Sequence, residues 1–180
     1  MTAVIERIAP AGTWTADPVH STVGFEVGYS GVSTFRGSFR EFAATLEESG
    51  LSGSAKVASV DVKDEQLNGH LQSPDFFDAQ RYPEISFTAT ELSRSGDDQV
   101  SAKGELTIKG VTHPITLEGT VSPAPTTDPF GCEKVGLTLR SEIDRTEYGI
   151  NWNAPNQSGG DYLATSVKLI AELTFVKAAE

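Results

Sequence analysis

The chain has 180 residues, of which 38% are hydrophobic and 22% charged, and this suits a single soluble domain with a sizeable core. Its net charge of −11 at pH 7 argues against nucleic acid partners and against charge-driven membrane binding, because both need clustered Lys and Arg. The sequence has one cysteine, Cys132, which excludes an internal disulfide and a cysteine metal cluster.

Residues 1–12 predict a flexible N-terminal arm, and the ordered part begins near Trp14. The arm has no basic start and no apolar run long enough for a signal peptide. No later segment approaches the ~20 apolar residues that a membrane-spanning helix needs. We therefore expect one domain over residues 13–177, no stable membrane insertion and, unless an export signal has been removed, a location in the cytoplasm.

The first clear strand covers residues 21–29, where apolar side chains such as Phe25 and Val27 alternate with small or polar ones. In the next segment the apolar positions change phase between Phe39 and Phe42. A β-bulge near Arg40–Glu41 would reconcile the two phases, since one extra residue reverses the faces of a strand.

The alternation stops between Asp64 and Gln80, where the pattern predicts two short helices joined near Ser73. Asp64 is a suitable N-cap for the first helix, and Pro74 can start the second. The apolar residues of such short helices need a surface to cover. We expect them to lie over one mouth of the structure that the strands form.

Alternation returns in residues 85–92, 100–108, 115–121, 135–143 and 166–175, each bounded by turn residues. With the earlier segments, including residues 54–62, these make roughly eight strands. Sequential antiparallel hairpins of this kind predict an all-β up-and-down barrel, with a β-sandwich as the alternative. A homodimer stays open, because an exposed strand edge would favour it whereas a closed barrel leaves no edge.

Catalytic and metal-binding signatures are absent from the sequence. His20, His70 and His113 lie far apart and have neither helical partners nor cysteine spacing, so we expect no metal site and no cofactor. Asp144–Arg145 is the most informative polar pair. Arg145 could bind an anionic head group, or the pair could tie the following loop to the barrel wall.

Four motifs in chain order resemble signatures of the YceI-like family of polyisoprenoid-binding proteins: DPVHSTVGFEV, SPDFFDAQRYPEISF, GELTIKGVTHPITLEGTV and IDRTEYGI. The resemblance runs from about Trp14 to Phe175. It implies an extended, lipocalin-like antiparallel barrel that holds a long isoprenoid or similar amphiphile and has no established catalysis. It also implies relatives that are often periplasmic, some of them linked to stress responses or to isoprenoid quinone metabolism.

The candidate ligand-binding residues are the apolar side chains expected to face inward, with His20 and Arg145 as candidate polar contacts. The apolar set is Phe25, Val27, Phe35, Phe39, Phe42, Phe76, Phe77, Phe87, Leu106, Leu117, Leu139, Ile143 and Trp152. Periodicity alone does not separate a lined cavity from a filled core, since both alternate in the same way.

The favoured function is therefore a non-catalytic carrier of a long lipophilic ligand, such as a polyisoprenoid or an isoprenoid quinone precursor. One alternative is a cyclase or isomerase acting on a lipophilic substrate in the same pocket, with His20 or Glu26 recruited as acid or base. Another is a filled barrel that serves only protein interaction.

Overall fold

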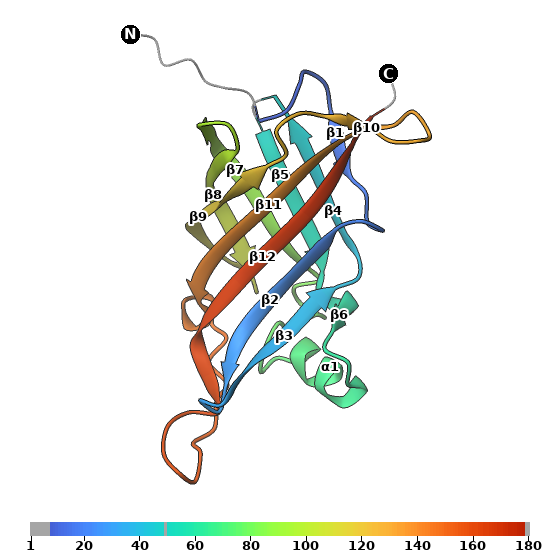
Figure 1. Cartoon of the computed structure of the whole chain (residues 1–180). Helices are drawn as coiled ribbons and strands as arrows, with labels where there is room; N and C mark the ends of the chain where they lie inside the picture. Colours follow the sequence, from blue (N-terminus) through green and yellow to red (C-terminus); the bar gives the residue numbers. More distant parts are fainter. Residues whose placement is uncertain (1–7, 49, 179–180) are drawn as a thin grey trace.

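The computed structural model describes residues 8–48 and 50–178, and its strands wrap into an elongated barrel with one helix at its side (Figure 1). The strands are β1 (Trp14–Ala16), β2 (Thr22–Tyr29), β3 (Ser33–Phe39), β4 (Phe42–Glu47), β5 (Gly50–Lys56), β6 (Val60–Asp61), β7 (Glu84–Ser95), β8 (Gln99–Ile108), β9 (Val111–Val121), β10 (Thr126–Thr127), β11 (Glu133–Asp144) and β12 (Leu163–Lys177). The helices are α1 (Glu65–Gln72) and the 3₁₀ turns η1 (Val57–Ser59) and η2 (Arg145–Tyr148).

Within the described residues, eight antiparallel strands form a closed ring in the order β1, β4, β5, β7, β8, β9, β11, β12. The ring closes where β12 pairs with both β11 and β1. β12 also pairs with β2, and β2 pairs with β3, so these strands lengthen the barrel beyond the ring. The predicted lipocalin-like barrel is confirmed, and the sandwich alternative is wrong.

In place of the β-bulge expected near Arg40–Glu41, the strand is interrupted there: β3 ends at Phe39 and the chain continues as β4 from Phe42. The interruption lies beside η1 of the neighbouring strand. The Arg40 amide donates to the Ser59 carbonyl at 3.0 Å, and the Glu41 amide donates to the Ser59 hydroxyl at 3.0 Å. These bonds satisfy the backbone while the apolar face changes phase, so Phe39 and Leu46 are both buried.

α1 begins as predicted, with Asp64 accepting a hydrogen bond from the Leu67 amide at 2.8 Å. The prediction of a second helix after Ser73 is wrong. The Phe77 amide reaches back to the Leu71 carbonyl, and Asp78 has φ of +53°. A left-handed residue ends helical continuation, so the segment folds as turns that direct Phe76 and Phe77 toward the barrel.

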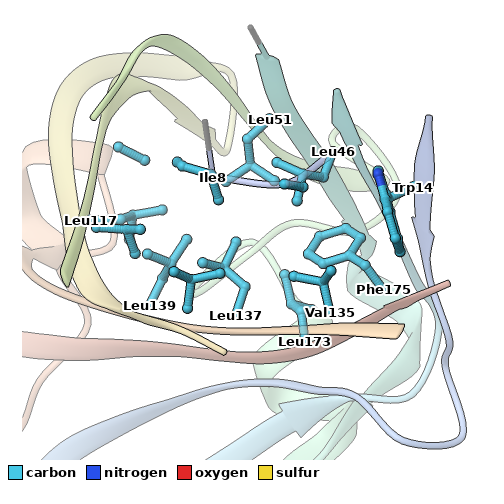
Figure 2. Close-up of a cluster of buried hydrophobic side chains, with 14 residues drawn as sticks. Ile8, Trp14, Leu46, Leu51, Leu117, Val135, Leu137, Leu139, Leu173 and Phe175 are labelled. Atoms are coloured by element: carbon cyan, nitrogen blue, oxygen red, sulfur yellow. The ribbon is translucent and has the colours of Figure 1, made fainter. Parts of the chain in front are cut away.

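One end of the barrel carries β1 and the last residues of β12, and the other carries α1 and the β2–β3 hairpin; we call them the β1 end and the α1 end (Figure 1). A cluster of fully buried side chains fills the β1 end, including Trp14, Leu46, Leu137 and Phe175. Ile8 lies in this cluster, inside the ring of strands (Figure 2).

A flexible arm is expected over residues 1–12, and residues 1–7 of it lie outside the described residues. Ile8 and Ala9 are 7% and 4% exposed, so at these two positions the chain packs into the barrel. The reason is apolar burial: the open end of a barrel needs a plug, and these side chains supply it.

Candidate ligand-binding cavity

The interior of the barrel is hollow between its two ends. An elongated cavity of about 420 Å³ runs along the inner faces of the strands, a size typical of small-molecule sites. Three side chains in the walls of the cavity are only half-buried, although they pack against the buried cluster of the core: Ile85, Phe87 and Leu169. Their remaining surface faces the cavity, so the alternation of these strands marks a lined space and not a packed core.

The floor of the cavity lies toward the β1 end. Leu51, Leu117, Leu139 and Leu173 line the cavity and also belong to the buried cluster of that end. Behind them Trp14 and Phe175 have no exposed surface. The cavity is therefore blind at the β1 end.

The mouth lies at the α1 end, where buried and half-buried aromatic side chains line the cavity. Phe77 packs edge-on against Phe25 and Phe39, with ring centroids 6.3 and 5.9 Å apart. Trp152 lies 5.4 Å from Phe76 and 5.1 Å from His70. Because these rings come from β2, β3, the segment after α1 and the 149–162 loop, the mouth is covered by parts that do not belong to the closed ring.

The structure places the apolar candidates together, with one exception. The following predicted residues line the cavity: Phe25, Val27, Phe35, Phe39, Phe76, Phe77, Phe87, Leu106, Leu117, Leu139, Ile143 and Trp152. Phe42 does not line it and packs against both buried clusters instead. Phe42 immediately follows the strand interruption, and this position turns its ring toward the packed wall.

His20 is not a polar contact of this cavity, so that prediction is wrong. Its side chain is 64% exposed, and its Nδ1 lies 2.7 Å from Asp17 Oδ2 in the turn between β1 and β2. Its neighbour Ser21 is buried and ties that turn to Thr174 of β12, whose amide donates to the Ser21 hydroxyl at 2.9 Å. His20 and Ser21 therefore stabilise the turn between β1 and β2 and its attachment to β12.

Arg145 lies at the cavity wall and is 5% exposed. Its guanidinium donates to the carbonyls of Ala164 and Ile150 at 2.8 Å, of Trp152 at 2.9 Å and of Leu163 at 3.5 Å. Burial lowers the pKa of Arg145, and the charges of Asp144 and Asp161 oppose that shift. The residue ties the 149–162 loop to β12, which is the structural role left open by the sequence.

Asp144 is the N-cap of η2. Its Oδ1 accepts from the Thr146 hydroxyl at 2.6 Å and from the Thr146 amide at 2.8 Å. These hydrogen bonds, the hydroxyl first, lower the pKa of Asp144 below its usual 3.8.

Sequence reasoning missed several polar residues of the lining, chiefly Tyr29, His70, Tyr148 and Tyr162. Tyr29 continues the inward phase of Phe25 and Val27, so alternation could have found it. Tyr148 and Tyr162 flank an irregular polar loop and have no periodic signal. A hydrogen bond with Tyr29, together with burial, raises the pKa of Tyr162.

The acid and base candidates are spread over the molecule. Glu26 pairs with Arg36 at 3.1 Å on the outer wall and is not part of the lining. His70 does line the cavity, with Nε2 at 3.1 Å from Asp75 Oδ2. In residues 8–48 and 50–178, no group of three or more His, Cys, Asp or Glu side chains is placed to hold a metal ion, and no helix is long and apolar enough to cross a membrane.

Comparison with known proteins decides the family. A family model described as the YceI-like domain matches residues 14–175. The chain belongs to this family. A UPF0312 protein of Staphylococcus aureus strain USA300 is 31% identical to this YceI-like chain over 169 residues, which covers 90% of the chain and 96% of that protein.

Solved structures share the fold. The YceI protein of Campylobacter jejuni superposes on this YceI-like domain with a TM-score of 0.71 at 25% identity, covering 82% of this chain and 88% of that one. A domain of Saccharophagus degradans, described as polyisoprenoid binding, has a TM-score of 0.71 at 13% identity and covers 92% and 98% of the two chains. The resemblance stated from the four sequence motifs is thereby confirmed.

Proposed function

We propose that this protein is a non-catalytic binding or carrier protein for a long lipophilic ligand, a polyisoprenoid or a similar amphiphile. The observation that carries the proposal is the blind, apolar cavity of about 420 Å³ with an aromatic mouth at the α1 end. A cavity of this form suits a molecule that enters with an apolar chain first. The described binding of polyisoprenoid by the Saccharophagus degradans domain supports the same ligand class.

The driving force is removal of the ligand chain from water. Each buried CH₂ group contributes about 0.8 kcal/mol, so a chain of several isoprene units binds tightly even after its ordering is included. Apolar walls discriminate weakly between tails of similar shape. We therefore expect selectivity to come from the length of the cavity and from the few polar groups in its lining.

The non-catalytic part of the proposal rests on where the acid and base candidates from the sequence lie. His20 and Glu26, the candidates for an enzyme, lie outside the cavity lining. A carrier returns its ligand unchanged, whereas a cyclase or isomerase does not. A cytoplasmic location stays a prediction, and a homodimer stays open.

Purification under mild conditions, native mass spectrometry and solvent extraction test the proposal. We expect a bound lipid that is recovered chemically unchanged after incubation. Phe39→Asp and Phe87→Asp, which place a charge in the lining, should each abolish lipid retention while circular dichroism shows a folded barrel. The exposed Lys168→Ala on β12 is the matched control and should retain lipid.

Equal lipid content in all these variants would contradict the assignment of the binding face. A wild-type protein that neither retains a small molecule nor takes one up from lipid vesicles would contradict the carrier and favour an interaction module. A chemically altered lipid after incubation would favour the enzyme.

A further inference from the structure

The hydroxyl of Tyr148 is a donor without a partner at the wall of the cavity. Tyr148 is 1% exposed, and its hydroxyl oxygen is buried with no hydrogen-bond partner among the described residues. Buried hydroxyls in folded proteins nearly always have a partner, because an unpaired one loses its hydration without compensation. Burial, with a smaller effect of Glu147, raises the pKa of Tyr148, so the hydroxyl keeps its proton at neutral pH.

Arg145 presents a second donor on the same side of η2. Arg145 and Tyr148 are the first and last residues of this 3₁₀ turn, and side chains three positions apart in a 3₁₀ helix eclipse one another. Both residues line the cavity. Four of the five N–H groups of the guanidinium have carbonyl acceptors, which leaves one Nη2 hydrogen without an acceptor in the described part of the chain.

Neighbouring groups do not supply the missing acceptor. The His113 ring meets Tyr148 edge-on at 5.0 Å, but its Nε2 is engaged with the Glu147 carbonyl at 2.9 Å. Asp144 Oδ1 accepts from the amide and the hydroxyl of Thr146, and no hydrogen bond joins the Asp144 carboxylate to Arg145 or Tyr148 among the described residues. A buried cation and a buried phenol thus remain beside a mostly apolar space.

We infer that the Tyr148 hydroxyl and the remaining Nη2 hydrogen of Arg145 bind the carbonyl oxygen of a lipid held in the cavity. A carbonyl oxygen has two lone pairs and can accept both bonds. An alcohol would bring a hydrogen that needs its own acceptor, and a diphosphate has more oxygens than two donors can satisfy. The inference rests on the proposed function and narrows its ligand class to carbonyl-bearing lipids.

The test compares an isoprenoid methyl ketone, farnesylacetone, with an isoprenoid hydrocarbon of matched length. Dissociation constants are measured by displacement of a fluorescent fatty-chain probe from the wild type, Tyr148→Phe and Tyr82→Phe. Tyr82→Phe is the matched control, because Tyr82 lies against Gly110 and does not line the cavity. We expect Tyr148→Phe to weaken ketone binding about fivefold to tenfold, as loss of one hydrogen bond does, and to leave hydrocarbon binding unchanged.

A second readout is the infrared band of the ¹³C-labelled ketone carbonyl. In the wild type it should lie below its frequency in hexane, and Tyr148→Phe should move it back toward that value. A hexane-like band in the wild type, or equal effects of Tyr148→Phe on ketone and hydrocarbon, would overturn the inference and leave the carrier function standing. Failure of the wild type to bind either lipid would overturn both.

Discussion

Arg145 of η2 and its N-cap Asp144 show how single polar side chains stabilise the structure around an apolar cavity. Arg145 is buried, yet its partners are backbone carbonyls of the 149–162 loop and of β12. A loop of this length has many carbonyls that no strand satisfies, and a guanidinium can satisfy several at once from one point. Arg145 therefore fixes the loop that carries Trp152, and Trp152 covers the cavity mouth.

Replacing Arg145 should therefore be costly to the fold. We expect Arg145→Leu to lower the free energy of unfolding by about 3 kcal/mol, because several buried carbonyls lose their donors together. Arg140→Leu is the control. The Arg140 side chain is 60% exposed, and its ion pair with Glu172 is long, at 3.7 Å, so its loss should change the free energy of unfolding by less than about 0.5 kcal/mol. Urea unfolding compares the two, and equal losses would contradict the role of Arg145.

Asp144 makes the stability of the fold depend on pH. Its native pKa is below the usual 3.8, so the unfolded chain binds the proton more tightly than the native protein does. Its contribution to stability is thus complete above 3.8 and is lost as pH falls through the native pKa. In urea midpoints measured from neutral pH to about pH 2, the wild type should exceed Asp144→Asn at neutral pH and converge with it in acid. A gap that stays constant across this range would contradict this account.

At the scale of the elements, close strand contacts depend on glycine. A Cβ at Gly119 of β9 would overlap the carbonyl oxygen of Thr138 on β11, and backbone cannot move aside without breaking the pairing. Gly119→Ala should reduce stability by about 3 kcal/mol. Gly136→Ala on β11 is the control, because its Cβ would meet Ser122 at an ordinary 3.8 Å. Similar thermal unfolding of the two variants would contradict the close approach.

The elements that sequence could predict are those with a period. Alternation located most of the strands, because inner faces of a barrel alternate strictly, and the phase change between Phe39 and Phe42 located the strand interruption. It missed β1, and the strand expected over residues 54–62 is broken by η1. The second helix was mispredicted since Pro74 and Asp78 signal turn and helix start alike. Which strand pairs close the ring, and how the 149–162 loop folds over the mouth, depend on long-range contacts that leave no local pattern.

The same limit applied to the site. Its apolar wall followed from alternation, whereas its polar groups did not. His20 looked promising from its motif but holds a turn. Tyr148 lies within the IDRTEYGI motif but gave no periodic signal, because it ends a short 3₁₀ turn in a polar segment. Whether a residue lies buried beside the cavity depends on how the whole barrel closes, and the local sequence does not show this.

For the whole molecule, the asymmetry of the two ends decides how a ligand enters and leaves. The β1 end is closed by Ile8 together with the buried cluster around Trp14, while the cover of the α1 end includes the half-buried rings of Phe77 and Trp152. Exchange should therefore pass through the α1 end, where the covering parts are separate from the hydrogen-bonded ring. Ile8 then acts as a seal, although it belongs to a segment outside the strands.

Ile8→Asp tests this arrangement. A carboxylate is too strongly hydrated to stay in the apolar cluster, so it should leave and admit water behind the floor of the cavity. We expect bound lipid to transfer to acceptor vesicles several times faster than from the wild type, in stopped-flow measurements with a fluorescent fatty-chain ligand. Ala11→Asp adds the same charge at an exposed position and should leave the rate unchanged. Unaltered transfer from Ile8→Asp would mean that the inner cluster alone closes this end and that Ile8 is no part of the seal.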